Sequence, residues 1–205
     1  MRHLSAAAAA ALASLAALAA LAGGAGAAPA ARAAGGAVKL AIGDTIDVKG
    51  TRVACFAIVA NKKPGIACML WSKNAPLVGS YGVGLAVDGT VVLNQVMADG
   101  NPKTLLKRTP QLAARRSDKV YTGRPGDSFG LPIDKTHILG CRVIEVKPGQ
   151  AALLYQGVKI ACWRATNELP VPNSNGVEIS ERYAAAYHFN AKGTVSGTLL
   201  VKRQP

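Results

Sequence analysis

The sequence has few of the residues that build catalytic and metal sites. Its 205 residues include 3 histidines and 11 acidic residues, and aromatic residues make up 5% of the chain. No Cys-x-x-Cys pair occurs, and no closely spaced set of cysteine and histidine offers zinc four ligands. No third glycine follows Gly82-Val83-Gly84 to complete a dinucleotide-binding loop. We therefore predict a protein that is not an enzyme and holds no metal or cofactor.

The few histidines and acids show no catalytic arrangement. We interpret His137 and His188 as surface or packing residues, because neither has an evident catalytic partner in the sequence. Asp44 and Asp127 each follow glycine and precede a hydroxyl residue, which is typical of a turn before a strand in which the carboxylate binds the backbone. Glu178 lies in a polar segment that we expect to be a solvated loop.

The only long apolar run lies near the N-terminus. A short basic leader precedes an alanine and leucine run over residues 4–21, and Ala25-Gly26-Ala27 fits the small-x-small rule of signal peptidase. We therefore predict a signal peptide over residues 1–27, followed by a disordered mature N-terminus over residues 28–37. Because Arg2 is the only charged residue lost, removing the peptide leaves 178 residues with a net charge of +12.

The apolar run has nearly the length of a membrane span, so an uncleaved N-terminal membrane anchor is the alternative. No later segment is long and apolar enough to span a membrane. No cysteine stands at the cleavage point to carry a lipid. We expect the mature chain to be secreted, with no membrane span.

Cysteine is scarce, and its four residues are even in number and widely spaced. Exported proteins fold in oxidising compartments, where such cysteines form disulfides. We predict two bonds, Cys55–Cys68 and Cys141–Cys162, in preference to the other two ways of pairing four cysteines.

The chain contains an internal repeat. Four groups of residues recur in the same order, which predicts two tandem copies of one unit. The matched groups are Gly43-Asp44-Thr45-Ile46 with Gly126-Asp127-Ser128-Phe129, Lys63-Pro64-Gly65 with Lys147-Pro148-Gly149, Tyr81 and Gly89-Thr90-Val91 with Tyr183 and Gly193-Thr194-Val195, and Thr104-Leu105-Leu106 with Thr198-Leu199-Leu200. We place β repeat 1 at residues 38–110, a basic linker at 111–118 and β repeat 2 at 119–205. The extra length of the second copy is expected at residues 150–155 and 167–178.

Each copy is expected to contain a hairpin that its disulfide crosses. The segments 53–59 and 66–71 are rich in β-branched and apolar residues, and the residues 61–65 between them have turn chemistry. With Cys55 opposite Cys68, one face of the hairpin carries the cysteines. The register then pairs Val53 with Leu70, Ala57 with Ile66 and, in the second copy, Val143 with Ile160, and it places Phe56, Met69 and Trp71 on the other face.

Short strands separated by glycine and proline turns predict an all-β fold. Asp88-Gly89 predicts a hairpin with a type I′ turn, and residues 190–193 predict a longer turn in the second copy. A copy of this size buries little core alone. We therefore predict two small disulfide-bonded antiparallel β units, sandwich or barrel-like, packed as a pseudo-symmetric pair.

Basic residues outnumber acidic ones, with 24 lysines and arginines and a net charge of +13. Seven of them fall within residues 101–125, against the single acid Asp118: Lys103, Lys107, Arg108, Arg115, Arg116, Lys119 and Arg124. Charge concentrated in this way attracts polyanions, and a solvated linker that keeps the protein soluble is the alternative. Nucleic-acid recognition would need more aromatic residues than Tyr121 among these charges, so nucleic acid is not the expected partner.

These features predict a secreted, non-enzymatic β protein that binds an anionic cell-envelope polymer or an extracellular protein. The seven basic residues are the candidates for binding a polyanion. The alternative is a secreted inhibitor or toxin-like factor that acts on a protein partner through the enlarged loop at residues 150–155. The face formed by Phe56, Met69 and Trp71, with Trp163 in the second copy, is either a contact surface or part of the core.

Overall fold

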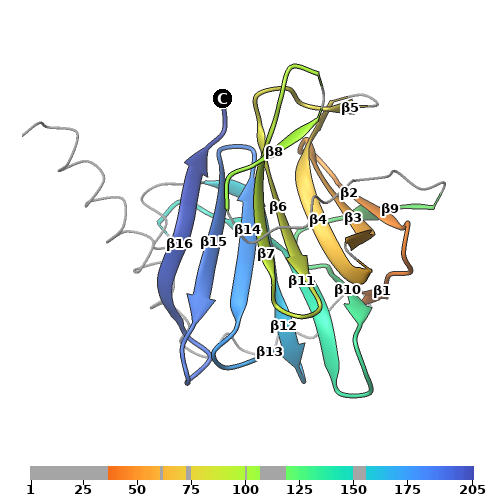
Figure 1. The fold of residues 1–205 in the computed structure, drawn as a ribbon, viewed down its shortest axis with the longest axis vertical. Helices are drawn as coiled ribbons and strands as arrows, with labels where there is room; N and C mark the ends of the chain where they lie inside the picture. Colours follow the sequence, from red (N-terminus) through yellow and green to blue (C-terminus); the bar gives the residue numbers. More distant parts are fainter. Residues whose placement is uncertain (1–36, 61, 73–74, 100, 107–118, 150–155) are drawn as a thin grey trace, which may run out of the picture.

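The computed structural model describes residues 37–60, 62–72, 75–99, 101–106, 119–149 and 156–205. Within these residues the chain forms strands and turns, which confirms the all-β prediction (Figure 1). No helix in the described part is long and apolar enough to cross a membrane. The predicted signal peptide, the predicted mature N-terminus up to residue 36 and the linker at 111–118 lie outside the described residues.

The strands form two eight-stranded sheets with the same strand order. The N-terminal sheet contains, from edge to edge, β8 (Pro102–Thr104), β7 (Val91–Val96), β6 (Tyr81–Ala86), β4 (Lys63–Ser72), β3 (Val53–Ala60), β2 (Thr45–Val48) and β9 (Val120–Gly123), with β5 (Ala75–Pro76) beside β4. The C-terminal sheet contains, in the corresponding positions, β16 (Val195–Arg203), β15 (Tyr183–Phe189), β14 (Asn175–Ser180), β12 (Gly157–Thr166), β11 (His137–Val146), β10 (Ser128–Pro132) and β1 (Val38–Lys39), with β13 (Leu169–Pro170) beside β12. The matching order of the two sheets agrees with the predicted arrangement of two packed β units.

The first strand of each copy belongs to the other copy's sheet. β1 pairs in parallel with β10, where Val38 lies beside Phe129. β9 pairs in parallel with β2, where Tyr121 lies beside Ile46. Each sheet therefore needs strands from both halves of the chain, so the predicted boundary at residue 119 does not separate the two sheets.

A turn of the same geometry precedes β2 and β10. Asp44 Oδ2 accepts a hydrogen bond from Ala41 N at 2.8 Å, and Asp127 Oδ2 accepts one from Arg124 N at 2.8 Å. Glycine precedes each aspartate because the backbone there has a positive φ, 96° at Gly43 and 95° in the second copy. The structure confirms the predicted role of both aspartates, which shape the chain where it passes from one sheet to the other.

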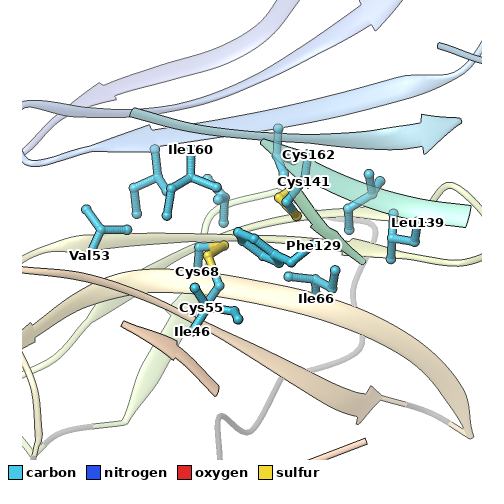
Figure 2. Packing of buried hydrophobic residues seen from close by; sticks show 14 of the residues in the cluster. Ile46, Val53, Cys55, Ile66, Cys68, Phe129, Leu139, Cys141, Ile160 and Cys162 are labelled. Carbon is cyan, nitrogen blue, oxygen red and sulfur yellow. A yellow bond between two sulfur atoms is a disulfide. The ribbon is translucent and has the colours of Figure 1, made fainter. Parts of the chain in front are cut away.

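The two sheets pack face to face around one shared core. Its largest side chains include Ile46, Val53, Ile66, Leu85 and Leu93 from the N-terminal sheet and Phe129, Leu139, Val143, Ile160 and Ile179 from the C-terminal sheet. Both disulfides lie in this core, and Figure 2 shows them on facing sides, with the Phe129 ring between them in that view. A single copy buries little apolar surface alone, so the shared core accounts for the packing of two copies together.

The disulfide pairing expected from the spacing is confirmed. Cys55 is bonded to Cys68 and Cys141 to Cys162, in each case with 4.0 Å between the Cα atoms. The strand registers are also as predicted: Val53 pairs with Leu70, Ala57 with Ile66 and Val143 with Ile160. The longer second hairpin therefore leaves the position of its cysteines unchanged.

The side chains that alternate with the cysteines form a second cluster, on the outer face of the N-terminal sheet. The ring centroids of Phe56 and Trp71 lie 5.0 Å apart, and Met69 packs with them. Phe56 is 0% exposed and Met69 is 9% exposed. Of the two interpretations of this face, the structure supports the packed one. Trp163, at the position equivalent to Met69, is half-buried.

The structure corrects part of the repeat alignment. Val83 and Val177 each lie beside the disulfide of their own sheet, so β6 corresponds to β14. Tyr183 begins β15 and therefore does not match Tyr81, which begins β6. Val83 and Val177 each lie 15 residues after the second cysteine of their own disulfide, Cys68 and Cys162. The second copy therefore has no extra residues at 167–178, and the prediction of added length there was wrong.

The match between the two Lys-Pro-Gly groups is also wrong. Lys63-Pro64-Gly65 lies inside β4, and the turn lies before it, where Lys62 has a positive φ of 62°. Residues 147–149 instead follow the end of β11. Glycine fits in β4 because the neighbouring strand approaches closely: a Cβ at Gly65 would lie 2.9 Å from Leu85 O.

The hairpin at Asp88-Gly89 is present, but its turn is not type I′. Ala86 N donates a hydrogen bond to Thr90 O at 2.9 Å, which leaves three residues in the loop. The backbone φ is positive at Gly89 but not at Asp88, whereas a type I′ turn needs both. The turn at residues 190–194 joins β15 to β16, so its counterpart is the turn between β7 and β8 and not the one at Asp88-Gly89. Both counterparts have the same hydrogen bond, from Met97 N to Asn101 O and from Asn190 N to Thr194 O, so the second is not longer.

Candidate functional site

The structure describes three of the seven basic candidates. Lys107, Arg108, Arg115 and Arg116 lie outside the described residues, as does the loop at residues 150–155 on which the inhibitor hypothesis rests. Lys103, Lys119 and Arg124 are described, and all three are exposed.

The fold separates Lys103 from the other two. Lys103 lies on β8 at one edge of the N-terminal sheet, whereas Lys119 and Arg124 flank β9 at the opposite edge. Five strands lie between β8 and β9. At about 4.8 Å for each step between strands, the two edges are roughly 25–30 Å apart. Lys103 therefore does not share a site with Lys119 and Arg124.

Lys49 joins Lys119 and Arg124 at this edge. β2 and β9 are parallel neighbours, and Lys49 N donates a hydrogen bond to Gly123 O at 2.9 Å. Lys49 and Arg124 therefore occupy adjacent positions at the ends of two strands, and both are exposed. Sequence reasoning missed Lys49 because only this long-range pairing brings it beside Arg124. We call Lys49, Lys119, Tyr121 and Arg124 the β9 edge.

Tyr121 provides an aromatic surface within the β9 edge. Lys119 Nζ lies 5.0 Å from the centroid of the Tyr121 ring, which is a cation–π distance. A side-chain hydrogen bond with Tyr121 raises the pKa of Lys119, and the charges of Tyr121 and Asp44 add to this effect. The ammonium group is thus held beside the ring in its charged form.

Most described acidic side chains bind groups within the protein itself. Asp44 and Asp127 bind turn backbone, Asp88 binds Lys63 and Thr90 N, Asp134 binds the backbone of Thr136 and His137, and Glu181 accepts a hydrogen bond from Arg52 N. In contrast, Lys49 and Arg124 form no ion pair within the described ranges. These acids therefore bind groups of the fold, whereas no described acid is paired with Lys49 or Arg124.

Glu178 is not in a solvated loop, so that expectation was wrong. It lies in β14, is 8% exposed, and binds Lys159 Nζ at 3.0 Å and the hydroxyl of Tyr183. Burial raises the pKa of Tyr187, and the charge of Glu178 adds to this effect. The equivalent residue in the first copy is Gly84. A carboxylate with both oxygens bound is a packing element of the second copy, not an available general base.

Residues 126–130 read Gly-Asp-Ser-Phe-Gly, which has the spacing of a nucleophile elbow. An elbow needs a sharp turn between a strand and a helix, with the serine at its top. Ser128 instead begins β10 and is paired with Arg142 in the neighbouring strand. No helix follows it among the residues that the structure describes. The motif therefore does not form an elbow here.

The two histidines lie on separate strands and contact nearby oxygens. His137 Nδ1 lies 2.9 Å from Asp134 Oδ2, and His188 Nδ1 lies 3.0 Å from Asn175 Oδ1. These local contacts agree with packing or surface roles. Over the described ranges, no group of three histidine, cysteine or acidic side chains is placed to hold a metal ion.

Comparison of the chain with protein-family models, curated proteins and solved structures gives no match.

Proposed function

We propose that this chain is an exported, non-enzymatic protein that binds an anionic polymer of the cell envelope. The observation that carries the proposal is the β9 edge, where three basic side chains and one aromatic ring surround an edge strand. Binding to a polyanion gains free energy when bases displace its counterions, and clustered bases also speed the encounter.

The backbone of β9 adds donors to these charges. No described strand pairs with its outer side. Thr45 N binds Lys119 O and Lys49 N binds Gly123 O, so the odd-numbered residues of this segment face β2. The N–H groups of Val120 and Thr122 consequently point outward, where they can donate hydrogen bonds to anionic oxygens.

The β9 edge continues directly into the most basic part of the sequence. Residues 107–118 contain Lys107, Arg108, Arg115 and Arg116 with one acid, and the next residue is Lys119. A ligand that carries one negative charge contacts a few of these bases at most. A polymer with repeated charges can contact many of them, so we favour a polymer.

Export is the second part of the proposal. Two disulfides lie in the core, and such bonds persist in oxidising compartments outside the cytoplasm. The leader over residues 1–27 has the pattern of a secretory signal. The polymers that such a protein meets include teichoic-type phosphate chains and acidic polysaccharides.

The test compares two variants of the mature chain that lose the same charge. One carries Lys49→Gln, Lys119→Gln and Arg124→Gln at the β9 edge. The control carries Lys62→Gln, Lys135→Gln and Lys192→Gln, three exposed bases in turns elsewhere. Binding to immobilised polyglycerol phosphate and to alginate is measured between about 50 and 300 mM salt.

The β9-edge variant should bind at least about fivefold more weakly than the control at low salt, with a shallower salt dependence. Equal loss in both variants would show that net charge alone attracts the polymer. Absence of binding by the unmodified protein to both polymers would exclude the proposal.

A further inference from the structure

β16 differs from the other three strands that end a sheet. β1, β8 and β9 have two, three and four residues, whereas β16 has nine. Short edge strands limit unwanted pairing, because an edge strand offers unpaired backbone groups to other chains. β16 corresponds to β8, so its length is a property of the second copy alone.

One half of β16 is disrupted and the other half is regular. Two register shifts interrupt its pairing with β15, between Ala186 and Tyr187 and between His188 and Phe189. Such bulges twist an edge and hinder the addition of a strand. They affect the first half of β16, while the pairing from Leu200 to Arg203 is continuous. This second half is therefore the part to which another strand can pair.

The regular half, together with the bulged Leu199 just before it, exposes apolar side chains beside backbone groups. Leu199 is 50% exposed and Val201 is 37% exposed. Gln204 N donates a hydrogen bond to Arg182 O at 2.9 Å, which fixes the alternation of the ladder at this end. In an antiparallel ladder the alternate residues face away from the neighbour, so the N–H and C=O groups of Val201 and Arg203 point outward.

We propose that β16 binds an extended acidic peptide segment, which adds to the C-terminal sheet as an antiparallel or parallel strand. Main-chain hydrogen bonds to Val201 and Arg203 supply affinity, and alternate side chains of the peptide pack on Leu199 and Val201.

The charge of this edge selects the partner. Lys202 and Arg203 lie on β16, and Arg182 lies beside its end, while β16 itself contains no acidic residue. The nearest acid in the sequence, Glu181, accepts a hydrogen bond from Arg52 N. A second copy of this chain would bring a net charge of +13 to a surface that is already basic. An acidic partner is attracted instead.

This surface is separate from the β9 edge. β16 ends the C-terminal sheet and β9 ends the N-terminal sheet, and Figure 1 shows them on opposite flanks of the molecule. Binding of a peptide at β16 is therefore independent of the proposed polymer site.

The probe is an eight-residue peptide of alternating glutamate and valine, and its control replaces each glutamate with lysine. Binding to the mature protein is followed by NMR through the amide shifts of Val201 and Arg203. Val201→Pro removes an outward N–H without breaking a ladder bond, which edge strands tolerate. Val120→Pro makes the matched change on β9, and thermal unfolding checks that both variants are folded.

The glutamate peptide should shift the Val201 and Arg203 amides, and Val201→Pro should weaken its binding at least about tenfold. Val120→Pro should leave binding unchanged, and Lys202→Gln with Arg203→Gln should weaken it about threefold or more. Equal binding of the lysine peptide, or unchanged binding by a folded Val201→Pro variant, would overturn the proposal. So would a dimer that forms through β16 in the absence of peptide and disappears in the Val201→Pro variant.

Discussion

The side chain of Gln204 binds both backbone groups of Tyr81. Its Oε1 accepts a hydrogen bond from Tyr81 N at 2.8 Å, and its Nε2 donates one to Tyr81 O at 3.2 Å. This amide therefore substitutes for a neighbouring strand residue and joins the end of β16 to the start of β6 in the other sheet. The Gln204 contact holds the regular half of β16 in place. The backbone of this half therefore loses less conformational entropy when a partner binds.

Replacing Gln204 should weaken the contact between the sheets. Gln204→Ala leaves the partly buried backbone groups of Tyr81 without this partner, so we expect a loss of about 1–3 kcal/mol in the free energy of unfolding. Gln204→Glu keeps the acceptor but loses the donor. Its free energy of unfolding should therefore lie between those of the unmodified protein and Gln204→Ala. Urea unfolding measures the change, with Lys192→Ala as an exposed control. Equal stability of Gln204→Ala and the unmodified protein would contradict the structural role.

Removing one partner of the Lys159–Glu178 ion pair should destabilise the fold, whereas removing both partners should destabilise it much less. Lys159→Met leaves the Glu178 carboxylate buried without its cation, and we expect a loss of about 3–5 kcal/mol. The double variant Lys159→Met, Glu178→Leu removes both charges and should recover most of that loss. Chemical unfolding of the two single variants and the double variant gives the coupling free energy.

The first copy shows why the pair can be replaced as a unit. Its equivalent positions are Gly65 and Gly84, so the same sheet position is occupied there without charge. The contrary result is a double variant that loses as much free energy of unfolding as Lys159→Met and Glu178→Leu lose together. That result would show that Lys159 and Glu178 act independently.

Asp88 should make the hairpin of β6 and β7 sensitive to acid. Desolvation raises its pKa, but hydrogen bonds from Lys63 and Thr90 outweigh this and lower the pKa from 3.8 to about 2. Since the folded pKa lies below the unfolded one, the stabilisation is present above about pH 4 and is lost as the pH falls through about 2. NMR titration of the Asp88 carboxyl should give a midpoint near 2. In unfolding experiments Asp88→Asn should reduce the stability difference between pH 5 and pH 2.

The strand pairs around the cysteines could be predicted from sequence because local information determines them. Two apolar segments with a turn between them have one register that places Cys55 opposite Cys68, and the alternation of a strand then assigns every other side chain to a face. The same reasoning recovered Asp44 and Asp127, whose function in a turn depends on their immediate neighbours.

The exchange of β1 and β9 could not be predicted in this way. These strands are short, and their pairing partners lie 91 residues away for β1 and 75 residues away for β9. The alignment of Tyr81 with Tyr183 failed for a related reason: one shared residue type was weaker evidence than the position of each strand beside its disulfide. Lys49 was missed because its membership of the β9 edge depends on the same exchange.

The basic segment at residues 107–118 supplies a further prediction, because the β9 edge follows it directly in the sequence. Replacing Lys107, Arg108, Arg115 and Arg116 with glutamine should weaken retention on polyglycerol phosphate and make its salt dependence shallower, since fewer counterions are released. Stability should hardly change, because surface charges generally contribute little to folding. Retention and thermal unfolding are measured on the same preparations.

Combining this fourfold variant with the β9-edge substitutions tests whether the two groups bind one polymer chain. If they do, the loss in the combined variant should differ from the sum of the separate losses, since a polymer released from one group is held less effectively near the other. Independent groups would give losses that add. A linker that only keeps the protein soluble would leave retention and its salt dependence unaltered in the fourfold variant, and the polymer would then be bound by Lys49, Lys119 and Arg124 without the linker.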